Sequence, residues 1–267
     1  MKDSITFMNK WKKTLIILLW LAIWQTTATA VHNSIMLVGP IEALQTLWGL
    51  LPSHDFWNSM FHSFFRISAG FLAAFLAGLV LGSLAYSIPF IRDFLEPPML
   101  FFKSVPVASF VILALIWAGS RNLSIVIAFI VVLPIVYVNT IAGLESTDRK
   151  LLEMAQVFRI FLWKKIRYIY LPALVPYLLG ACRISLGMSW KSGVAAEVIG
   201  LPEHSIGEHL YLSKIYLETA DLFAWTLVII LISAVFERIV LFLISRLCPP
   251  PMKPALKGES SHEITGK

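Results

Sequence analysis

The segment from residue 143 to residue 172 reads GLESTDRKLLEMAQVFRIFLWKKIRYIYLP. It joins two long apolar stretches, and it is too long for a simple turn and too apolar for a linker. Asp148 belongs to the residue types that cap helices, so a first short helix is expected to begin at Arg149. A second is expected from Ile160 to Tyr168, and Pro172 suits the first turn of the apolar helix that follows.

This segment combines an apolar face with a basic composition. Leu151, Ala155 and Phe158 share one face of the first expected helix. Residues 143–170 also carry six basic side chains, namely Arg149, Lys150, Arg159, Lys164, Lys165 and Arg167. Two surfaces could receive such a pair of helices: anionic lipid headgroups, or a protein partner. These residues by themselves leave that choice open.

The composition of the whole chain identifies the class of protein. Of the 267 residues, 58% are hydrophobic and 14% are charged, and the mean hydropathy is +0.77. Soluble domains have about 45–50% apolar and about 25% charged residues. This surplus of apolar surface exceeds what one soluble core can cover, and low charge with two cysteines excludes a disordered chain or a disulfide framework. We therefore expect an all-α, polytopic membrane protein.

Six stretches are long and apolar enough to cross a bilayer, which takes about 20 residues. They are Thr14–Val31, Phe64–Ile88, Leu100–Ala118, Leu123–Ala142, Leu171–Ile199 and Leu222–Ile244. Lys103 and Pro106 interrupt the third stretch, which is the weakest. The expected organisation is an N-terminal part, 1–63, a transmembrane core, 64–246, which contains the connection 143–170, and a flexible cytoplasmic tail, 247–267.

The basic residues between these stretches predict the orientation in the membrane. When the connections are assigned to alternating sides, fifteen Lys and Arg fall on one side and two on the other. Because positive residues concentrate on the cytoplasmic side, both termini are expected to be cytoplasmic in a cell inner membrane. The first stretch, with Lys12-Lys13 before it and Ala28-Thr29-Ala30 at its end, also resembles a cleavable signal peptide; we expect it to be retained as an anchor.

Three features outside the connection concern packing and the outer surface. Ile41–Leu51 has the pattern of a short amphipathic helix, which is expected on the outer membrane surface. In the second stretch Ala74, Gly78 and Gly82 recur every four residues and so share a face on which another helix can approach closely. Arg66, near the outer end of the same stretch, is expected to be an interfacial anchor that snorkels.

The fifth stretch carries charges that a membrane span rarely holds. Arg183, Trp190 and Glu197 fall in one stripe of a helix, and Lys191 lies at its edge. A charge at mid-bilayer costs about 2.5–3.5 kcal/mol, so these groups are expected to face the bundle interior, a dimer interface or a water-filled path. Lys191 and Arg183 could attract an anionic solute. Alternatively the charges form internal ion pairs or Arg183 reaches backbone carbonyls, a reading favoured for Arg183 and Glu197.

The connection resembles the cytoplasmic loop of ABC importer permeases. In that family the loop opens with Glu-Ala-Ala, continues with a glycine and closes with Ile-x-Leu-Pro. Here Glu153-Met154-Ala155 stands at the start and Ile169-Tyr170-Leu171-Pro172 at the end, while Arg159 holds the glycine position. Because the glycine allows the turn between two short helices, Arg159 predicts a different turn or a longer first helix.

Other blocks resemble the nitrate, sulfonate and taurine type of these permeases, and together they cover roughly residues 60–245. They are Phe65-Arg66 with Gly70-Phe71-Leu72, Ser104-Val105-Pro106-Val107-Ala108, Ile116-Trp117-Ala118-Gly119, Ala181-Cys182-Arg183-Ile184-Ser185-Leu186-Gly187, Trp190 and Ala195-Ala196-Glu197.

The resemblance implies a type I importer permease that is not itself an enzyme. Two copies would form the channel, each docking the loop around Glu153–Pro172 into a groove of a cytoplasmic ATPase subunit. An external solute-binding protein would deliver a small solute of the nitrate, sulfonate or taurine kind. ATP and Mg²⁺ would be used by the ATPase subunit, and this chain is expected to bind no cofactor, metal or nucleic acid; it has no GxxxxGK[ST] run.

An ion-coupled secondary transporter is the alternative. Such a protein would need internal repeats and buried carboxylates for coupling. No repeat is found, and Glu197 is the one carboxylate well inside an apolar stretch, apart from Glu237 near the inner end of the last. A membrane-embedded enzyme is disfavoured because no catalytic set occurs.

Overall fold

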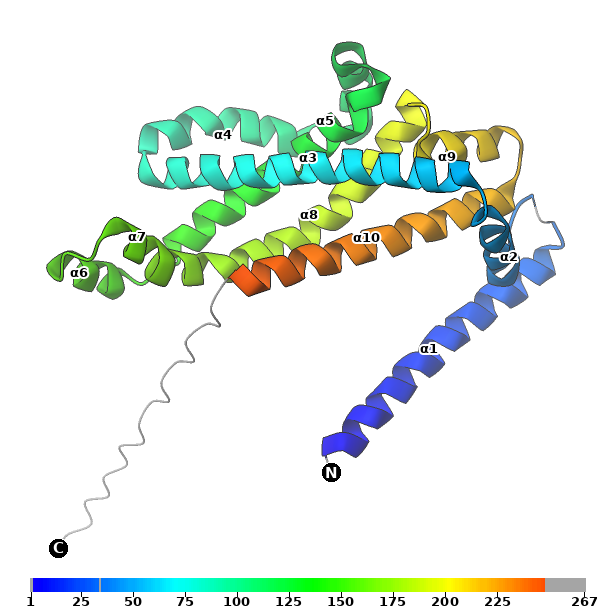
Figure 1. Ribbon diagram of the computed structural model, residues 1–267, viewed down its shortest axis with the longest axis horizontal. Coiled ribbons are helices and arrows are strands. Elements are labelled where there is room, and N and C mark those ends of the chain that lie inside the picture. The colour runs from blue at the N-terminus through cyan, green and yellow to red at the C-terminus, as the bar shows by residue number, and fades with distance from the viewer. Residues whose placement is uncertain (1, 34, 248–267) are drawn as a thin grey trace, which may run out of the picture.

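The computed structural model describes residues 2–33 and 35–247, and within them the chain is helical and has no strand (Figure 1). The helices are α1 (Lys2–Val31), α2 (Pro40–Leu50), α3 (His54–Ser87), α4 (Pro89–Ser104), α5 (Val107–Glu145), α6 (Arg149–Val157), α7 (Leu162–Lys165), the π-helix η1 (Ile166–Tyr170), α8 (Leu171–Gly200), α9 (Ile206–Ile215) and α10 (Thr219–Leu247). The expected tail, 247–267, falls outside the described residues from residue 248 onward.

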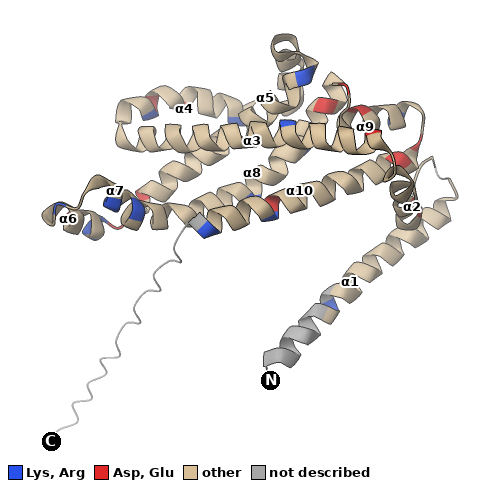
Figure 2. Ribbon diagram, in the orientation of Figure 1, with Lys and Arg blue, Asp and Glu red and all other residues tan. Residues whose placement is uncertain are grey.

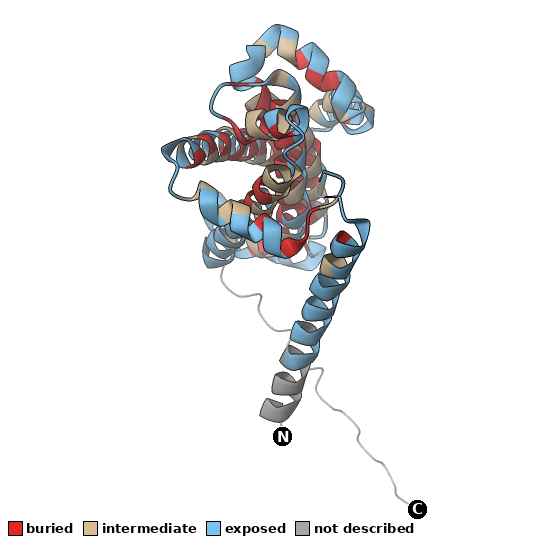
Figure 3. Cartoon of the chain, turned by 90° about the vertical axis from the view of Figure 1, so that its right-hand side faces the viewer, coloured by how far each residue is buried: buried red, intermediate tan, exposed pale blue. Residues whose placement is uncertain are grey.

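The bundle is built around α5, which packs against α3 and against α8. Helix α4 runs back along α3 and α5, and α10 packs against α8, α9 and α2. Helices α6 and α7 lie at one end of the bundle, called here the α6 end, and α2 and α9 lie at the other, the α9 end (Figure 1). Figure 3 shows the buried residues gathered in the middle of this bundle, while α1 extends away from it and is mostly exposed.

Small residues allow α3 and α5 to approach closely. Ala74, Gly78 and Gly82 are all buried on the side of α3 that α5 covers. A Cβ atom added to Gly78 would lie 2.8 Å from Cβ of Val136, and one added to Gly82 would lie 2.7 Å from Cβ of Thr140. Neither distance leaves room for a methyl group. The two helices can therefore keep this spacing only with glycine at both positions.

The described residues contain five helices long and apolar enough to span a membrane: Thr14–Val31, His54–Ser87, Val107–Glu145, Leu162–Gly200 and Thr219–Arg246. The predicted first stretch agrees with the first of these, and the fifth agrees with α8. The count of six spans is not confirmed, because the third predicted stretch, Leu100–Ala118, is not one helix. It is divided between α4 and α5 at Val105-Pro106, where proline supplies no N–H to continue the helix.

Helix α5 is itself sharply bent. Gly119 has φ 70° and ψ 168°, a conformation that side chains other than glycine rarely adopt, and no atom stands within 4 Å of where its Cβ would be. The segment before Gly119 and the segment after it therefore run in different directions. This bend falls between the predicted third and fourth stretches, so the two are separated, although α5 contains the end of the third and the whole of the fourth.

The second short helix of the connection also differs from expectation. It begins at Leu162, and instead of ending at Tyr168 it continues through the π-turn of η1 into α8. The amide of Leu171 donates to the carbonyl of Ile166, five residues back. Pro172 has no N–H for the ordinary helical ladder, which explains why the hydrogen-bond register changes at this point. Helix α8 is thus joined directly to the connection.

Close packing of α3 on α5 predicts the effect of adding a methyl group there. We expect Gly78→Ala and Gly82→Ala each to lower the free energy of unfolding by about 1–3 kcal/mol, because Val136 and Thr140 are branched at the contact. Melting temperatures of the purified chain in detergent measure this. Gly49→Ala is the control, since nothing lies within 4 Å of its added Cβ; equal melting temperatures for all three variants would contradict the packing.

Candidate functional site

The coupling segment, residues 149–170, begins as the sequence predicted. Oδ1 of Asp148 accepts a hydrogen bond from the amide of Lys150 at 2.9 Å, which caps α6. Helix α6 ends at Val157, and Arg159 adopts φ 47°, in the left-handed region that favours glycine. The amide of Ile160 then donates to the carbonyl of Ala155 at 2.9 Å and closes the helix. Of the two outcomes predicted from Arg159, the longer first helix does not occur, because α6 ends at Val157. Arg159 instead forms the turn in a left-handed conformation.

The coupling segment presents large apolar side chains to its surroundings. Val157, Phe158 and Phe161 are each more than 70% exposed, and Met154 is 43% exposed. Glu153 and Arg159 are exposed as well, whereas Ala155 and Ile169 are buried and Leu171 and Pro172 half-buried. Basic residues gather on the same two helices, α6 and α7 (Figure 2). The segment is thus a basic surface with an uncovered apolar face.

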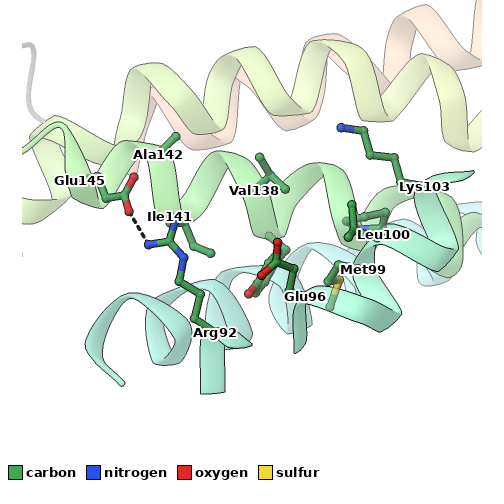
Figure 4. Close-up of a pocket in the computed structure, with 11 residues that line it drawn as sticks. Arg92, Glu96, Met99, Leu100, Lys103, Val138, Ile141, Ala142 and Glu145 are labelled. Atoms are coloured by element: carbon green, nitrogen blue, oxygen red, sulfur yellow. Dashed lines mark hydrogen bonds and ion pairs between the residues drawn. The ribbon is translucent and has the colours of Figure 1, made fainter. Parts of the chain in front are cut away.

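An ion pair fixes the end of α5 from which this segment leaves. Nη1 of Arg92, on α4, lies 2.7 Å from Oε1 of Glu145, the last residue of α5. Figure 4 shows this contact at the edge of a cavity of about 360 Å³, with Glu96 and Lys103 also on its wall. Both members of the pair are about half exposed, so the contact orients the two helices more than it stabilises them.

A second cavity of about 340 Å³ continues along the same face of the bundle. Lys103 lines both cavities, and Asn139 of α5 and Ile184 and Met188 of α8 line the second. The two cavities share Lys103, Pro134 and Val138 as lining residues, and the pair, lined by residues of α4, α5 and α8, is called here the α8 groove. Lys103 had appeared in the sequence only as an interruption of an apolar stretch; its place in the groove follows from the break at Pro106.

The four residues of the predicted stripe on α8 differ in their exposure. Arg183 and Lys191 are exposed on the surface of the chain, whereas Trp190 and Glu197 are buried. The Trp190 ring packs 6.1 Å from that of Phe64 and 6.3 Å from that of Phe236, so it belongs to the core. Only the two basic residues of the four are therefore accessible, and both lie on the helix that borders the α8 groove.

Glu197 is bound by hydrogen bonds and not by a basic residue. Its Oε2 accepts a bond of 2.6 Å from the Ser63 hydroxyl and one of 3.4 Å from the amide of Gly207. Ser63 in turn accepts from the amide of Ile206 at 2.9 Å. The reading favoured from sequence for Arg183 and Glu197 was an internal ion pair or, for Arg183, contact with backbone carbonyls. Neither residue forms an ion pair among the described residues, and fourteen residues of helix separate the two by about 21 Å.

Arg66 is not the simple interfacial anchor predicted from sequence. Its side chain is half-buried, and its Nη1 is buried with no hydrogen-bond partner. It lines a cavity of about 450 Å³ at the α9 end, called here the outer pocket. The outer pocket is bounded by His62, Arg66, Ser120, Arg121, Leu201, Pro202, Glu203 and His204. Sequence reasoning missed this cluster because its members come from three separate parts of the chain.

Comparison with known proteins identifies the family to which this architecture corresponds. Residues 70–248 match the family described as binding-protein-dependent transport system inner membrane component. The match covers about two thirds of the chain, and it contains the coupling segment, the α8 groove and most of the outer pocket.

Several transport permeases are similar in sequence. The chain is 28% identical over 257 residues to a protein of Bacillus subtilis (strain 168) that bears the name aliphatic sulfonates transport permease protein SsuC, covering 95% of this chain and 90% of that one. It is 28% identical to the taurine transport system permease protein TauC of Escherichia coli (strain K12), over 71% of this chain and 74% of that one. It is 27% identical to the nitrate import permease protein NrtB of Synechocystis sp., over 67% and 68%.

The hydrogen bonds of Glu197 predict a stability effect at the α9 end. We expect Ser63→Ala to lower the free energy of unfolding by about 1.5–3 kcal/mol, because it removes the shortest bond to a fully buried carboxylate. Thermal unfolding in detergent measures the change. Ser87→Ala provides the control, since that exposed hydroxyl bonds only to a carbonyl of its own helix. A Ser63 variant as stable as the Ser87 variant would contradict the role of this bond.

Proposed function

Because the chain belongs to the inner membrane components of binding-protein-dependent transport systems, a family of multi-pass transport permeases, we propose that it is the permease subunit of an ATP-driven importer. A separate ATPase subunit supplies the energy, and a solute-binding protein delivers the solute at the α9 end. The α6 end is cytoplasmic, as the excess of basic residues on that side indicates.

The exposed apolar face of the coupling segment carries this proposal. Val157, Phe158 and Phe161 are exposed at the end of α6 and in the turn between α6 and α7. These two short helices carry basic residues and lie at one end of the bundle (Figures 1 and 2). Exposed apolar groups of this size, rimmed by charge, mark an interaction site for a protein or a membrane. Of the two partners that the sequence left open, lipid headgroups or a protein, we propose a protein, namely a groove on the ATPase subunit.

The connection to α8 gives the ATPase a way to act on the solute path. The segment passes through η1 into α8 without an intervening loop, and Glu145 at its other end is held to α4 by Arg92. A displacement of the coupling segment therefore moves both α8 and α5. These helices border the α8 groove, which we propose is half of the path that two copies of the permease enclose.

A small anion is the solute class that fits the groove. Lys103 lines it, and Arg183 and Lys191 are exposed on the helix beside it. Glu96 and Glu145 also line the groove, but Glu145 is paired with Arg92, and no carboxylate forms an ion pair with Lys103, Arg183 or Lys191 among the described residues. Relatives bear names that specify sulfonates, taurine and nitrate. We infer transport of a small sulfonate-like anion.

Loss of the apolar face should prevent assembly with the ATPase. For the double variant Val157→Asp with Phe158→Asp we expect capture of the co-expressed ATPase subunit to fall by at least about tenfold, because charges would replace the contact surface. Affinity purification of the tagged permease, with the ATPase band quantified, measures this. Tyr216→Asp, similarly exposed but at the α9 end, should retain full capture; undiminished capture by the double variant would contradict the docking.

The basic residues at the groove predict a transport effect. We expect Lys103→Met and Lys191→Met each to reduce uptake of radiolabelled ethanesulfonate by about tenfold, because a positive charge in a cleft raises the local concentration of an anion. The rates are compared in cells with equal amounts of the variant in the membrane. Lys214→Met is the control, because Lys214 is exposed on α9 and its substitution removes the same charge away from the groove. Uptake at the wild-type rate in both groove variants would exclude them from the path.

A further inference from the structure

The outer pocket gathers two arginines that no carboxylate neutralises at contact distance. Arg66 comes from α3 and Arg121 from the segment after the bend in α5, and both line the pocket. Neither forms an ion pair within the described part of the chain, although Glu203 lines the same pocket. Two unpaired guanidinium groups on one concave wall favour an anion, because they repel each other until a negative charge lies between them.

Unusual backbone conformations occur in the segments that line this pocket. Arg121 follows the bend at Gly119 by two residues, and it lines the same pocket as Arg66 of α3. Leu201 and His204, which also line the pocket, both adopt left-handed conformations, with φ 48° and 53°, and Leu201 does so as the C-cap of α8. Such conformations are unfavourable for side chains other than glycine, and they concentrate where a chain must place particular groups.

The buried Glu197 side chain also constrains the position of Arg66. Glu197 is fixed by Ser63 and Gly207, and it lies close enough to attract the Arg66 guanidinium without an ion-pair contact. Nη1 of Arg66 is buried and makes no hydrogen bond, so the guanidinium of this pocket-lining side chain keeps an unused donor. This arrangement fixes the position of a positive charge without neutralising it.

The remaining walls indicate the chemical class of the anion. His62 and His204 stand with their rings 6.2 Å apart, and each neutral imidazole can donate one hydrogen bond. Leu201 and Pro202 add an apolar wall. At about 450 Å³ the pocket is in the range that holds small organic ligands. A short alkanesulfonate has the charge, the oxygens and the apolar tail that these walls complement.

We propose that the outer pocket is an anion-binding site of the permease itself, which takes a short alkanesulfonate at the α9 end, outside the α8 groove. This inference rests on the proposed function for the identity of the solute. It assigns to the permease a selectivity separate from that of the solute-binding protein. Residues at the bend in α5 and in the loop between α8 and α9 line the site. A movement of α5 or α8 therefore also moves residues of the site.

Ethanesulfonate binding to the full-length chain tests the site. Purified permease in nanodiscs is titrated with ethanesulfonate at constant ionic strength, and saturation-transfer NMR of the ethyl protons gives the Kd. We expect saturable binding that weakens by about tenfold or more in Arg66→Gln and in Arg121→Gln, since each removes a charge-assisted contact. Arg121 is exposed, so its variant tests the site even if Arg66→Gln fails to fold.

Lys214→Gln is the matched control, because it removes one positive charge from an exposed residue at the same end outside the pocket. An unchanged Kd in this control supports the site. A wild-type chain without saturable binding would overturn it, as would Arg121→Gln with the wild-type Kd, or binding lost in Lys191→Met but kept in the pocket variants.

Capture of the ATPase subunit by the same preparations separates this proposal from the proposed function. Capture without ethanesulfonate binding overturns the pocket and leaves the permease assignment standing. Arginine-dependent binding by a chain that captures no ATPase overturns the permease assignment and leaves the pocket standing.

Discussion

Close packing of α5 between α3 and α8 is the constraint on which the rest of this structure depends. In hydrocarbon the hydrophobic effect does not draw helices together, so association relies on fit between their surfaces. Gly78 and Gly82 provide that fit on α3, with Val136 and Thr140 of α5 directly opposite. Because α5 is held along its length, the groove, the bend and the start of the coupling segment all have fixed positions relative to one another.

Several of the few charged residues lie where we propose that the bundle contacts a partner protein or a solute. At the α6 end, Arg92 and Glu145 orient the helix from which the coupling segment leaves. Along the α8 groove, Lys103 stands without a carboxylate partner among the described residues. Glu197 is an exception, since it is fully buried and joins α3, α8 and α9 through hydrogen bonds. Its role is therefore structural, and it supports the wall beside Arg66.

Local features of this chain could be predicted from sequence, and features that depend on distant contacts could not. The cap at Asp148, the helix over 41–50 and the span at Thr14–Val31 were confirmed because each is set by residues close in sequence. The left-handed conformation of Arg159 was not predicted, because residues with a Cβ atom disfavour that conformation. The hydrogen bonds that close α6 require it nevertheless. The outer pocket was missed because it needs the bend at Gly119 to bring Arg121 to Arg66.

The proposed function requires that this bundle move a solute with energy taken from ATP on a partner subunit. Uptake of radiolabelled ethanesulfonate or taurine into proteoliposomes, containing the permease, its ATPase subunit and the solute-binding protein, tests it most directly. We predict uptake that requires ATP and persists when ionophores abolish every ion gradient. Uptake that proceeds without ATP and stops when the gradient is lost would contradict the account and identify an ion-coupled transporter instead.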